Sequence, residues 1–182
     1  MELHYGRPDT TDGREEREVR TYDFLDSLGI EYWQTDHEKR AESMEDCKEV
    51  DAILQATICK NLFLCNRQKT VFYLLMMPGD KNFKTKELSS QIHSARLSFA
   101  PEEKMVEYLD IYPGAVSVMG LMNDKDKHIN LLIDEDVLKG EFLGCHPCVN
   151  TSSLKIRTKD IIETFLPAVG HEYVTVHLTG EE

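Results

Sequence analysis

Lys60 and Asn61 stand inside an apolar run, Thr57 to Cys65, that has the length and composition of a β-strand. Because strand side chains alternate between faces, each of the two polar residues has apolar neighbours on its own face. A buried lysine or asparagine is costly unless it gains a polar partner or a polar cavity. We therefore expect Lys60 to anchor an anionic ligand; the alternative is an edge strand on which a lysine discourages aggregation.

A second candidate site is the loop sequence from Gly144 to Asn150, in which Cys145 and Cys148 flank His146 and Pro147. A redox C-x-x-C motif is normally followed at once by a helix, which lowers the pKa of the thiol, whereas this one precedes a loop and a strand. Structural zinc commonly needs a second cysteine pair, which the sequence lacks. His146 is expected to contact a ligand or to hydrogen-bond the backbone of its own loop.

Small residues recur between Pro113 and Leu121, where they would let the backbone approach a ligand closely. The simpler interpretation is a turn that leads into a strand. The chain has no Walker-type phosphate loop, no dinucleotide fingerprint and no serine nucleophile elbow.

The elements that must position these residues alternate between helices and short strands. The pattern predicts strands at residues 30–34, 56–65, 70–77, 96–99, 115–119, 129–133, 153–157 and 173–178. It predicts helices that begin near Asp12, Ser43, Thr85, Pro101, Asp134 and Thr158, with Asp12 and Glu15 as a capping box and Thr158 as a cap. Since most successive strands are joined by turns of hairpin length, we expect an α+β fold with a largely antiparallel sheet.

The composition is that of one globular domain. The chain has 182 residues, of which 41% are apolar, and no linker or repeat divides it. Its apolar runs are far shorter than the roughly 20 residues of a membrane span, and its start lacks an apolar signal segment. Five cysteines suggest no disulfide scaffold, so a cytoplasmic location is expected. We expect residues 1–13 to be a flexible segment and residues 14–182 to form one domain.

The formal net charge is −12, and residues 1–54 carry much of it, with 16 acidic against 7 basic side chains. Such a protein should not coat nucleic acid nonspecifically, because phosphate binding depends on lysine and arginine. It can still hold one end of a nucleic acid through a local patch or present these cations as a solvated face. Two patches qualify: Lys81, Lys84, Lys86 and Arg96 in the first, and Lys155, Arg157 and Lys159 in the second.

Five segments occur in an order that resembles the YbaK/ProX family of prolyl-tRNA editing proteins. They are Cys59 to Leu64, Arg96 to Ala100, Pro113 to Ser117, Gly120 to Asp124 and His146 to Thr151. The resemblance spans about residues 20–178. It implies a mixed, strongly curved sheet surrounded by helices, and a freestanding protein that deacylates alanyl-tRNA mischarged on the proline tRNA.

The resemblance also implies roles for individual residues. Lys60 would be the essential lysine near the tRNA 3′ end, with Asn61 beside it. The stretch from Gly114 through Ser117 to Val118 resembles the G-x-x-x-P loop that shapes the amino-acid pocket, although Val118 stands where the pattern has proline, and Gly120 follows it. His146 and Asn150 would line the opposite side. Neither a metal nor a cofactor is implied, because the ribose hydroxyl of the substrate is thought to assist the attacking water.

Several alternatives stay open at this point. The pocket could accept cysteine or another small residue, since its size cannot be read from the sequence. The chain could instead be a non-catalytic tRNA- or synthetase-binding module of the same fold, or a dithiol oxidoreductase. The expected partner is the acceptor end of tRNA. Because the charge predicts weak unaided binding, prolyl-tRNA synthetase or an elongation factor would supply specificity.

Overall fold

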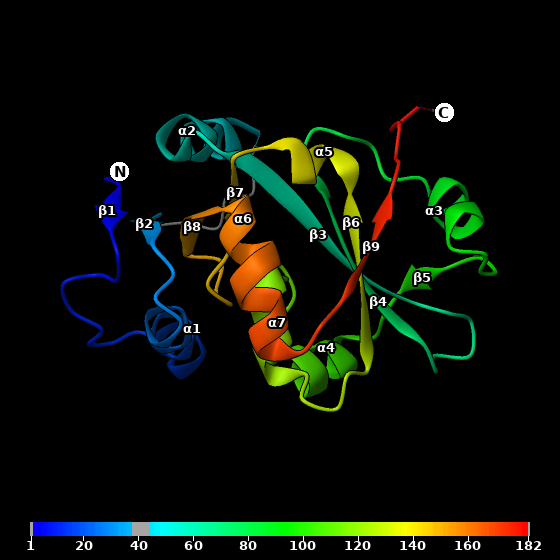
Figure 1. Ribbon diagram of the computed structural model, residues 1–182, viewed down its shortest axis with the longest axis horizontal. Coiled ribbons are helices and arrows are strands. Elements are labelled where there is room, and N and C mark those ends of the chain that lie inside the picture. The colour runs from blue at the N-terminus through cyan, green and yellow to red at the C-terminus, as the bar shows by residue number, and fades with distance from the viewer. Residues whose placement is uncertain (1, 38–43, 182) are drawn as a thin grey trace.

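The computed structural model describes residues 2–37 and 44–181, and within them nine strands form one sheet (Figure 1). The order across the sheet is β1-β2-β8-β7-β3-β4-β6-β9, and β5 pairs with β3. The strands are β1 (His4–Tyr5), β2 (Tyr32–Asp36), β3 (Thr57–Cys65), β4 (Phe72–Pro78), β5 (Ser98–Phe99), β6 (Ile129–Asp134), β7 (Phe142–Cys145), β8 (Ser152–Arg157) and β9 (Tyr173–Val176).

The sheet is mixed, as the sequence predicted, with antiparallel pairs in the majority. Three neighbouring pairs are parallel, namely β3 with β7, β4 with β6 and β6 with β9. Parallel neighbours need crossover connections, so fewer strands than expected are joined by short hairpins. The predicted α+β class is confirmed.

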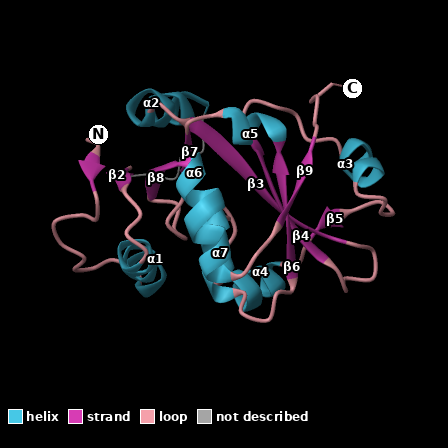
Figure 2. Cartoon of the chain, viewed as in Figure 1, coloured by secondary structure: helices cyan, strands magenta, loops and turns pink. Residues whose placement is uncertain are grey.

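Helices surround the sheet (Figure 2). The run from α6 through α7 passes across its middle in this view, while α1 and α3 lie toward opposite ends. The helices are α1 (Glu16–Ser27), α2 (Met44–Leu54), α3 (Thr85–Gln91), α4 (Glu102–Leu109), α5 (Glu135–Lys139), α6 (Thr158–Asp160) and α7 (Leu166–Val169), with a 3₁₀ turn η1 (Val118–Asn123) and a π-helical turn η2 (Ile161–Phe165). The predicted helix start at Ser43 lies outside the described residues.

The Phe63–Cys65 end of strand β3 is covered on both faces, which is why its sequence there is apolar. Phe63 and Cys65 belong to the main core, while Leu64 packs in a second cluster with Leu88 of α3 and Leu97. Around Lys60 and Asn61 the strand is only partly buried, so the expected cover on both faces is found at the far end of β3 and not at these two residues.

Three local predictions are wrong. Residues 115–119 form no strand, because the Ser117 hydroxyl accepts a hydrogen bond from the Met119 amide at 3.2 Å and starts the turn η1. Helix α1 is capped at Glu15 without a side-chain hydrogen bond, so there is no Asp12 capping box. Thr158 is the first residue of α6 rather than its cap.

The segment before α1 is attached to the sheet. His4 and Tyr5 pair with Gln34 and Trp33 of β2, and the Gly6 amide donates to the Tyr32 carbonyl at 2.8 Å. Arg7 forms ion pairs with Asp23 and Asp26 of α1. The domain boundary at residue 13 stays a prediction.

Candidate active site

Lys60 lies at the centre of β3, opposite Met77 of β4, with its side chain half-buried. Its ammonium donates a hydrogen bond to the Lys81 carbonyl at 2.7 Å. No carboxylate of the described residues lies within 4 Å of this ammonium, so two N–H donors are left for a ligand. An ammonium held this way suits a phosphate, a ribose hydroxyl or a developing oxyanion.

The acceptor for Lys60 is itself held in place. The Lys81 ammonium bridges Asp134 and Asp136, each at 2.8 Å, and also donates to the Leu178 carbonyl at 2.5 Å. Lys81 therefore works inside the structure as a tie between β4, β6 and the C-terminal segment. It contributes little to the basic patch in which the sequence placed it.

Asn61 points to the opposite face of β3, toward the main core. Its side-chain amide donates weakly to the Cys59 carbonyl at 3.4 Å, and its buried Oδ1 has no partner within the described residues. An unpaired buried acceptor is costly, so this oxygen is available for a donor on a ligand or a water. Consecutive strand positions thus give Lys60 and Asn61 different surroundings.

His146 follows β7, the parallel neighbour of β3, in which Gly144 pairs with Ile58. Its Nδ1 donates to the Ser152 carbonyl at 2.8 Å, because a carbonyl oxygen only accepts. Nε2 is therefore left as a hydrogen-bond acceptor. Burial lowers the pKa of His146 below its ordinary value of 6.5, against the opposing effect of the Ser152 contact, so the ring is neutral at neutral pH.

Asn150 and Gly114 come together from distant parts of the chain. Gly114 has a φ of +91°, and a Cβ there would lie 3.2 Å from the Asn150 side-chain nitrogen. A side chain at position 114 would be strained and would also crowd Asn150. The structure thus places the predicted Pro113–Gly114 turn against the loop that carries His146.

Three further residues predicted to shape the pocket lie in the core, just after the Pro113–Gly114 turn. Ser117, Val118 and Gly120 are all buried, and Ser117 caps η1. A Cβ on Gly120 would lie 2.7 Å from the Ile111 Cδ1 atom, so η1 packs closely on α4 and the following segment. Their roles in an amino-acid pocket stay predictions.

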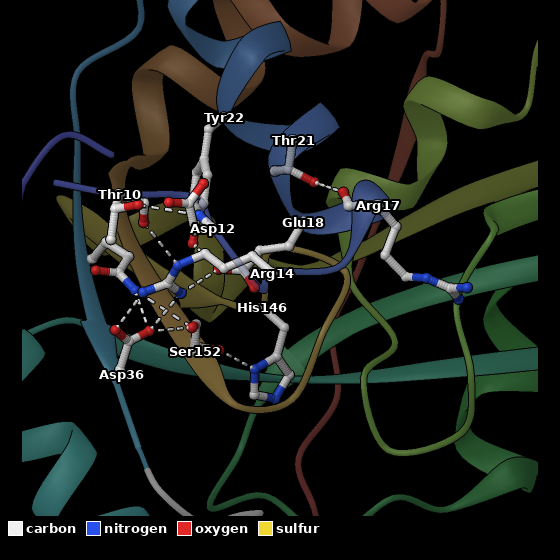
Figure 3. Close-up of polar contacts among 11 residues, drawn as sticks. Thr10, Asp12, Arg14, Arg17, Glu18, Thr21, Tyr22, Asp36, His146 and Ser152 are labelled. Carbon is white, nitrogen blue, oxygen red and sulfur yellow. Dashed lines mark hydrogen bonds and ion pairs between the residues drawn. The ribbon is translucent and has the colours of Figure 1, made fainter. Parts of the chain in front are cut away.

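The sequence did not reveal the polar network that supports the His146 loop (Figure 3). The Ser152 hydroxyl donates to Asp36 Oδ1 at 2.5 Å, and the Arg14 guanidinium grips both Asp36 oxygens at 2.9 and 2.7 Å. Arg14 also pairs with Glu18 at 2.6 Å. Ser152 thereby connects His146 to the segment before α1. The only signal in the sequence was the concentration of charge before residue 55.

The C-x-x-C thiols lack the features of a redox pair. Cys145 and Cys148 are both free and buried. Burial raises the pKa of Cys145 well above its ordinary value and that of Cys148 to about 12. Thiols protonated at neutral pH are poor nucleophiles, so the geometry does not favour the dithiol alternative.

Comparison with known proteins defines the class of the protein. Residues 38–164 match the aminoacyl-tRNA editing domain family. The chain belongs to this family, and its resemblance to YbaK/ProX proteins is confirmed. It is accordingly an aminoacyl-tRNA deacylase, an ester hydrolase.

Individual relatives extend over most of the chain. "Prolyl-tRNA editing protein ProX" from Acetoanaerobium sticklandii is 29% identical over 154 residues, which cover 85% of this chain and 93% of that protein. "Prolyl-tRNA synthetase associated domain-containing protein 1" from Danio rerio is 27% identical over 151 residues, 82% of this chain and 80% of that one.

Solved structures show the same fold. A crystal structure of a proposed trans-editing enzyme for prolyl tRNA synthetase has a TM-score of 0.67 at 13% identity and covers 90% of this chain and 98% of its own. The hypothetical protein APE2540 has a TM-score of 0.65 at 16% identity, with 87% and 98% covered. Within residues 2–37 and 44–181, no helix combines the length and apolar composition of a membrane span.

Proposed function

We propose that this protein removes a wrongly attached amino acid from the proline tRNA, and that the amino acid is alanine. The names of its relatives in A. sticklandii and D. rerio refer to prolyl-tRNA and to its synthetase, which supports the choice of tRNA. The partners would be the acceptor end of that tRNA and prolyl-tRNA synthetase, with an elongation factor as a further carrier of the substrate.

The observation that carries the proposal is the ammonium of Lys60, fixed by one backbone carbonyl and facing no carboxylate of the described residues. In this proposal Lys60 binds a phosphate or ribose oxygen at the tRNA 3′ end and acts as neither nucleophile nor base. An aminoacyl ester is already activated, so binding and orientation account for most of the acceleration.

The attacking water would be oriented by acceptors rather than by a nucleophilic triad. His146 offers Nε2 for this role. Asn61, whose side chain lies on the opposite face of β3 from Lys60, would offer its unpaired Oδ1 to a donor on that other face. The terminal ribose hydroxyl of the substrate would complete this arrangement. None of these groups is itself a carboxylate that would repel a phosphate of the tRNA 3′ end.

Selection for alanine would follow from size. A synthetase site built for proline discriminates poorly against a smaller residue, because each missing methylene is worth only about 1–3 kcal/mol. A second pocket can admit alanine and exclude proline sterically. The turn at Gly114 packed on Asn150 supports a narrow pocket at this position.

The test is deacylation of alanyl-, cysteinyl-, seryl- and prolyl-tRNA by the purified chain. We expect alanyl-tRNA to be hydrolysed fastest and prolyl-tRNA to be spared. Lys60→Ala should lower kcat/KM by about 100-fold or more while the protein stays folded, and Lys69→Ala, in the exposed β3–β4 loop, should change nothing. Rapid hydrolysis by Lys60→Ala would refute the assignment, and inactivity of the unaltered chain on every ester would indicate a binding module.

A further inference from the structure

An aromatic platform lies on one face of β1, β2, β7 and β8. These strands form the end of the sheet away from β9 (Figure 1). Its rings join edge to face: Tyr5 lies 5.7 Å from Trp33, and Trp33 lies 5.8 Å from Phe142. Tyr5 is 64% exposed, and the other two rings are half-buried. We define the platform as these three rings together with Lys155 and Arg157.

Two cations lie over the rings. The Lys155 ammonium sits 4.3 Å from the Phe142 centroid and 5.6 Å from that of Trp33, and the Arg157 guanidinium sits 5.4 Å from Trp33. Arg157 is paired with Glu31 at 2.6 Å. Lys155, in contrast, has no carboxylate within 4 Å among the described residues. The charge of the Lys155 ammonium could therefore be neutralised by a phosphate group of a ligand, although the protein as a whole is acidic.

The platform shares a face of the sheet with Lys60. Strand register aligns Trp33 with Lys155, Lys155 with Gly144, and Gly144 with Ile58, which stands two residues before Lys60. Side chains in one row across a sheet point to the same face. Three steps between strands amount to about 14 Å, so the platform flanks the candidate active site. Leu54 of α2 packs on the row at Gly144, between the two.

We infer that this platform is a second contact for the RNA substrate, at which one or two unpaired bases stack on the rings while Lys155 binds a backbone phosphate. The inference rests on the proposed function, because it takes tRNA as the substrate. Partly exposed rings interleaved with cations on a sheet face can bind single-stranded RNA, since every base has a face that can stack. A protein partner would have to supply a carboxylate at the Lys155 ammonium, whereas every nucleotide of an RNA carries a phosphate.

The chain contains a single tryptophan, so Trp33 reports on this site alone. The probe is an uncharged RNA minihelix of the proline acceptor stem with its single-stranded 3′ end, and a blunt minihelix without that end is the control. We expect the first RNA to quench Trp33 emission and the second to leave it unchanged. Absence of quenching at RNA concentrations where fluorescence anisotropy shows binding would overturn the inference.

Substitutions separate this contact from catalysis. Tyr5→Ala and Lys155→Ala should each weaken minihelix binding about tenfold and raise KM for deacylation with kcat unchanged, while Lys69→Ala should alter neither. If both variants bind and edit like the unaltered protein while Lys60→Ala is inactive, the platform inference fails and the proposed function stands. If light scattering shows a dimer that Tyr5→Ala dissociates, the platform is a self-association surface and the inference is wrong.

Discussion

His146 illustrates how a single backbone contact fixes the chemistry of a side chain. Because Nδ1 is committed to the Ser152 carbonyl, the acceptor Nε2 is the atom that a water or a ribose hydroxyl would meet. Burial keeps the pKa of the ring below 6.5 and therefore preserves the acceptor form. The loop supplies both the orientation and the charge state that the proposed reaction needs.

This arrangement predicts the acid limb of the pH–rate profile. Activity should stay constant as the pH falls to about 6.5 and decline only below it, when Nε2 gains a proton. His146→Ala should lower kcat by about 100-fold and remove the limb. Deacylation rates at saturating substrate between pH 5 and 8 check both points, and an acid limb that persists in His146→Ala would assign it to another group.

Lys60 and His146 show which features of a candidate site can be read from a sequence and which cannot. Lys60 could be identified as a candidate because a cation within an apolar strand conflicts with its immediate neighbours, and this conflict is visible in nine consecutive residues. The network of Ser152, Asp36 and Arg14 that supports His146 could not be predicted from the sequence. Arg14 and Ser152 are distant in the chain, and each is of a residue type that is common on protein surfaces.

At the scale of elements, the Arg14–Asp36 contact joins the segment before α1 to β2 and β8. Hydrogen bonds from Arg14, and then from Ser152 and Gln34, lower the pKa of Asp36 from 3.8 to about 2 although partial burial opposes them. A carboxylate whose pKa is lower in the folded state stabilises the fold above its unfolded pKa. That stabilisation disappears as the pH falls from about 4 to about 2.

Asp36→Asn should therefore reduce the pH dependence of stability. We expect the substitution to cost about 1 kcal/mol at pH 6, since the Asp36 side chain is half exposed to screening solvent, and to cost much less near pH 2. Urea unfolding of both proteins at the two pH values measures this difference. A cost that is the same at both would mean that the ion pair contributes nothing and only packing is lost.

Strong periodicity predicted elements better than composition did. Strands β3 and β4 lie within two residues of their predicted ranges, because long apolar runs on either side of a polar loop permit little else. The strand predicted at residues 115–119 was wrong. The β-branched residues there suggested a strand, but the Ser117 cap and the close packing of Gly120 favour a tight turn. Such packing depends on Leu109 and Ile111, which local patterning does not address.

Gly120→Ala tests this explanation of η1. The added methyl would lie 2.7 Å from Ile111 Cδ1 and 3.0 Å from Leu109 Cβ, so α4 or η1 must shift. Overpacking of this kind costs about 1–3 kcal/mol. Urea unfolding should show a loss in that range, and the same alanyl-tRNA assay should show weaker discrimination against prolyl-tRNA if η1 supports the pocket wall. Unchanged stability would mean that the turn is looser than the structure indicates.

At the scale of the whole molecule, the fold class followed from the alternation of elements, but the order of strands did not. The pairing of β3 with β4 can be predicted because a short loop joins the two strands. The parallel pairs β3–β7 and β4–β6 join segments that are far apart in the sequence, so their pairing cannot be predicted in this way. The contact of β3 with β7 brings the loop that carries His146 beside the strand that carries Lys60. The sequence could nominate candidate site residues one at a time, but it could not show that these two segments are neighbours.

The net charge of −12 sets how this molecule meets a polyanion. With few cations free to replace counterions, the isolated chain should bind tRNA with a Kd in the micromolar range or weaker. The affinity should fall with salt at a logarithmic slope of only about 2–3, because each phosphate contact contributes about 0.9. Lys155→Ala should reduce that slope by about one and Lys69→Ala by none. Anisotropy titrations between 50 and 300 mM salt measure these slopes, and tight binding that ignores salt would mean that base contacts, rather than the Lys60 and Lys155 ammonium groups, hold the RNA.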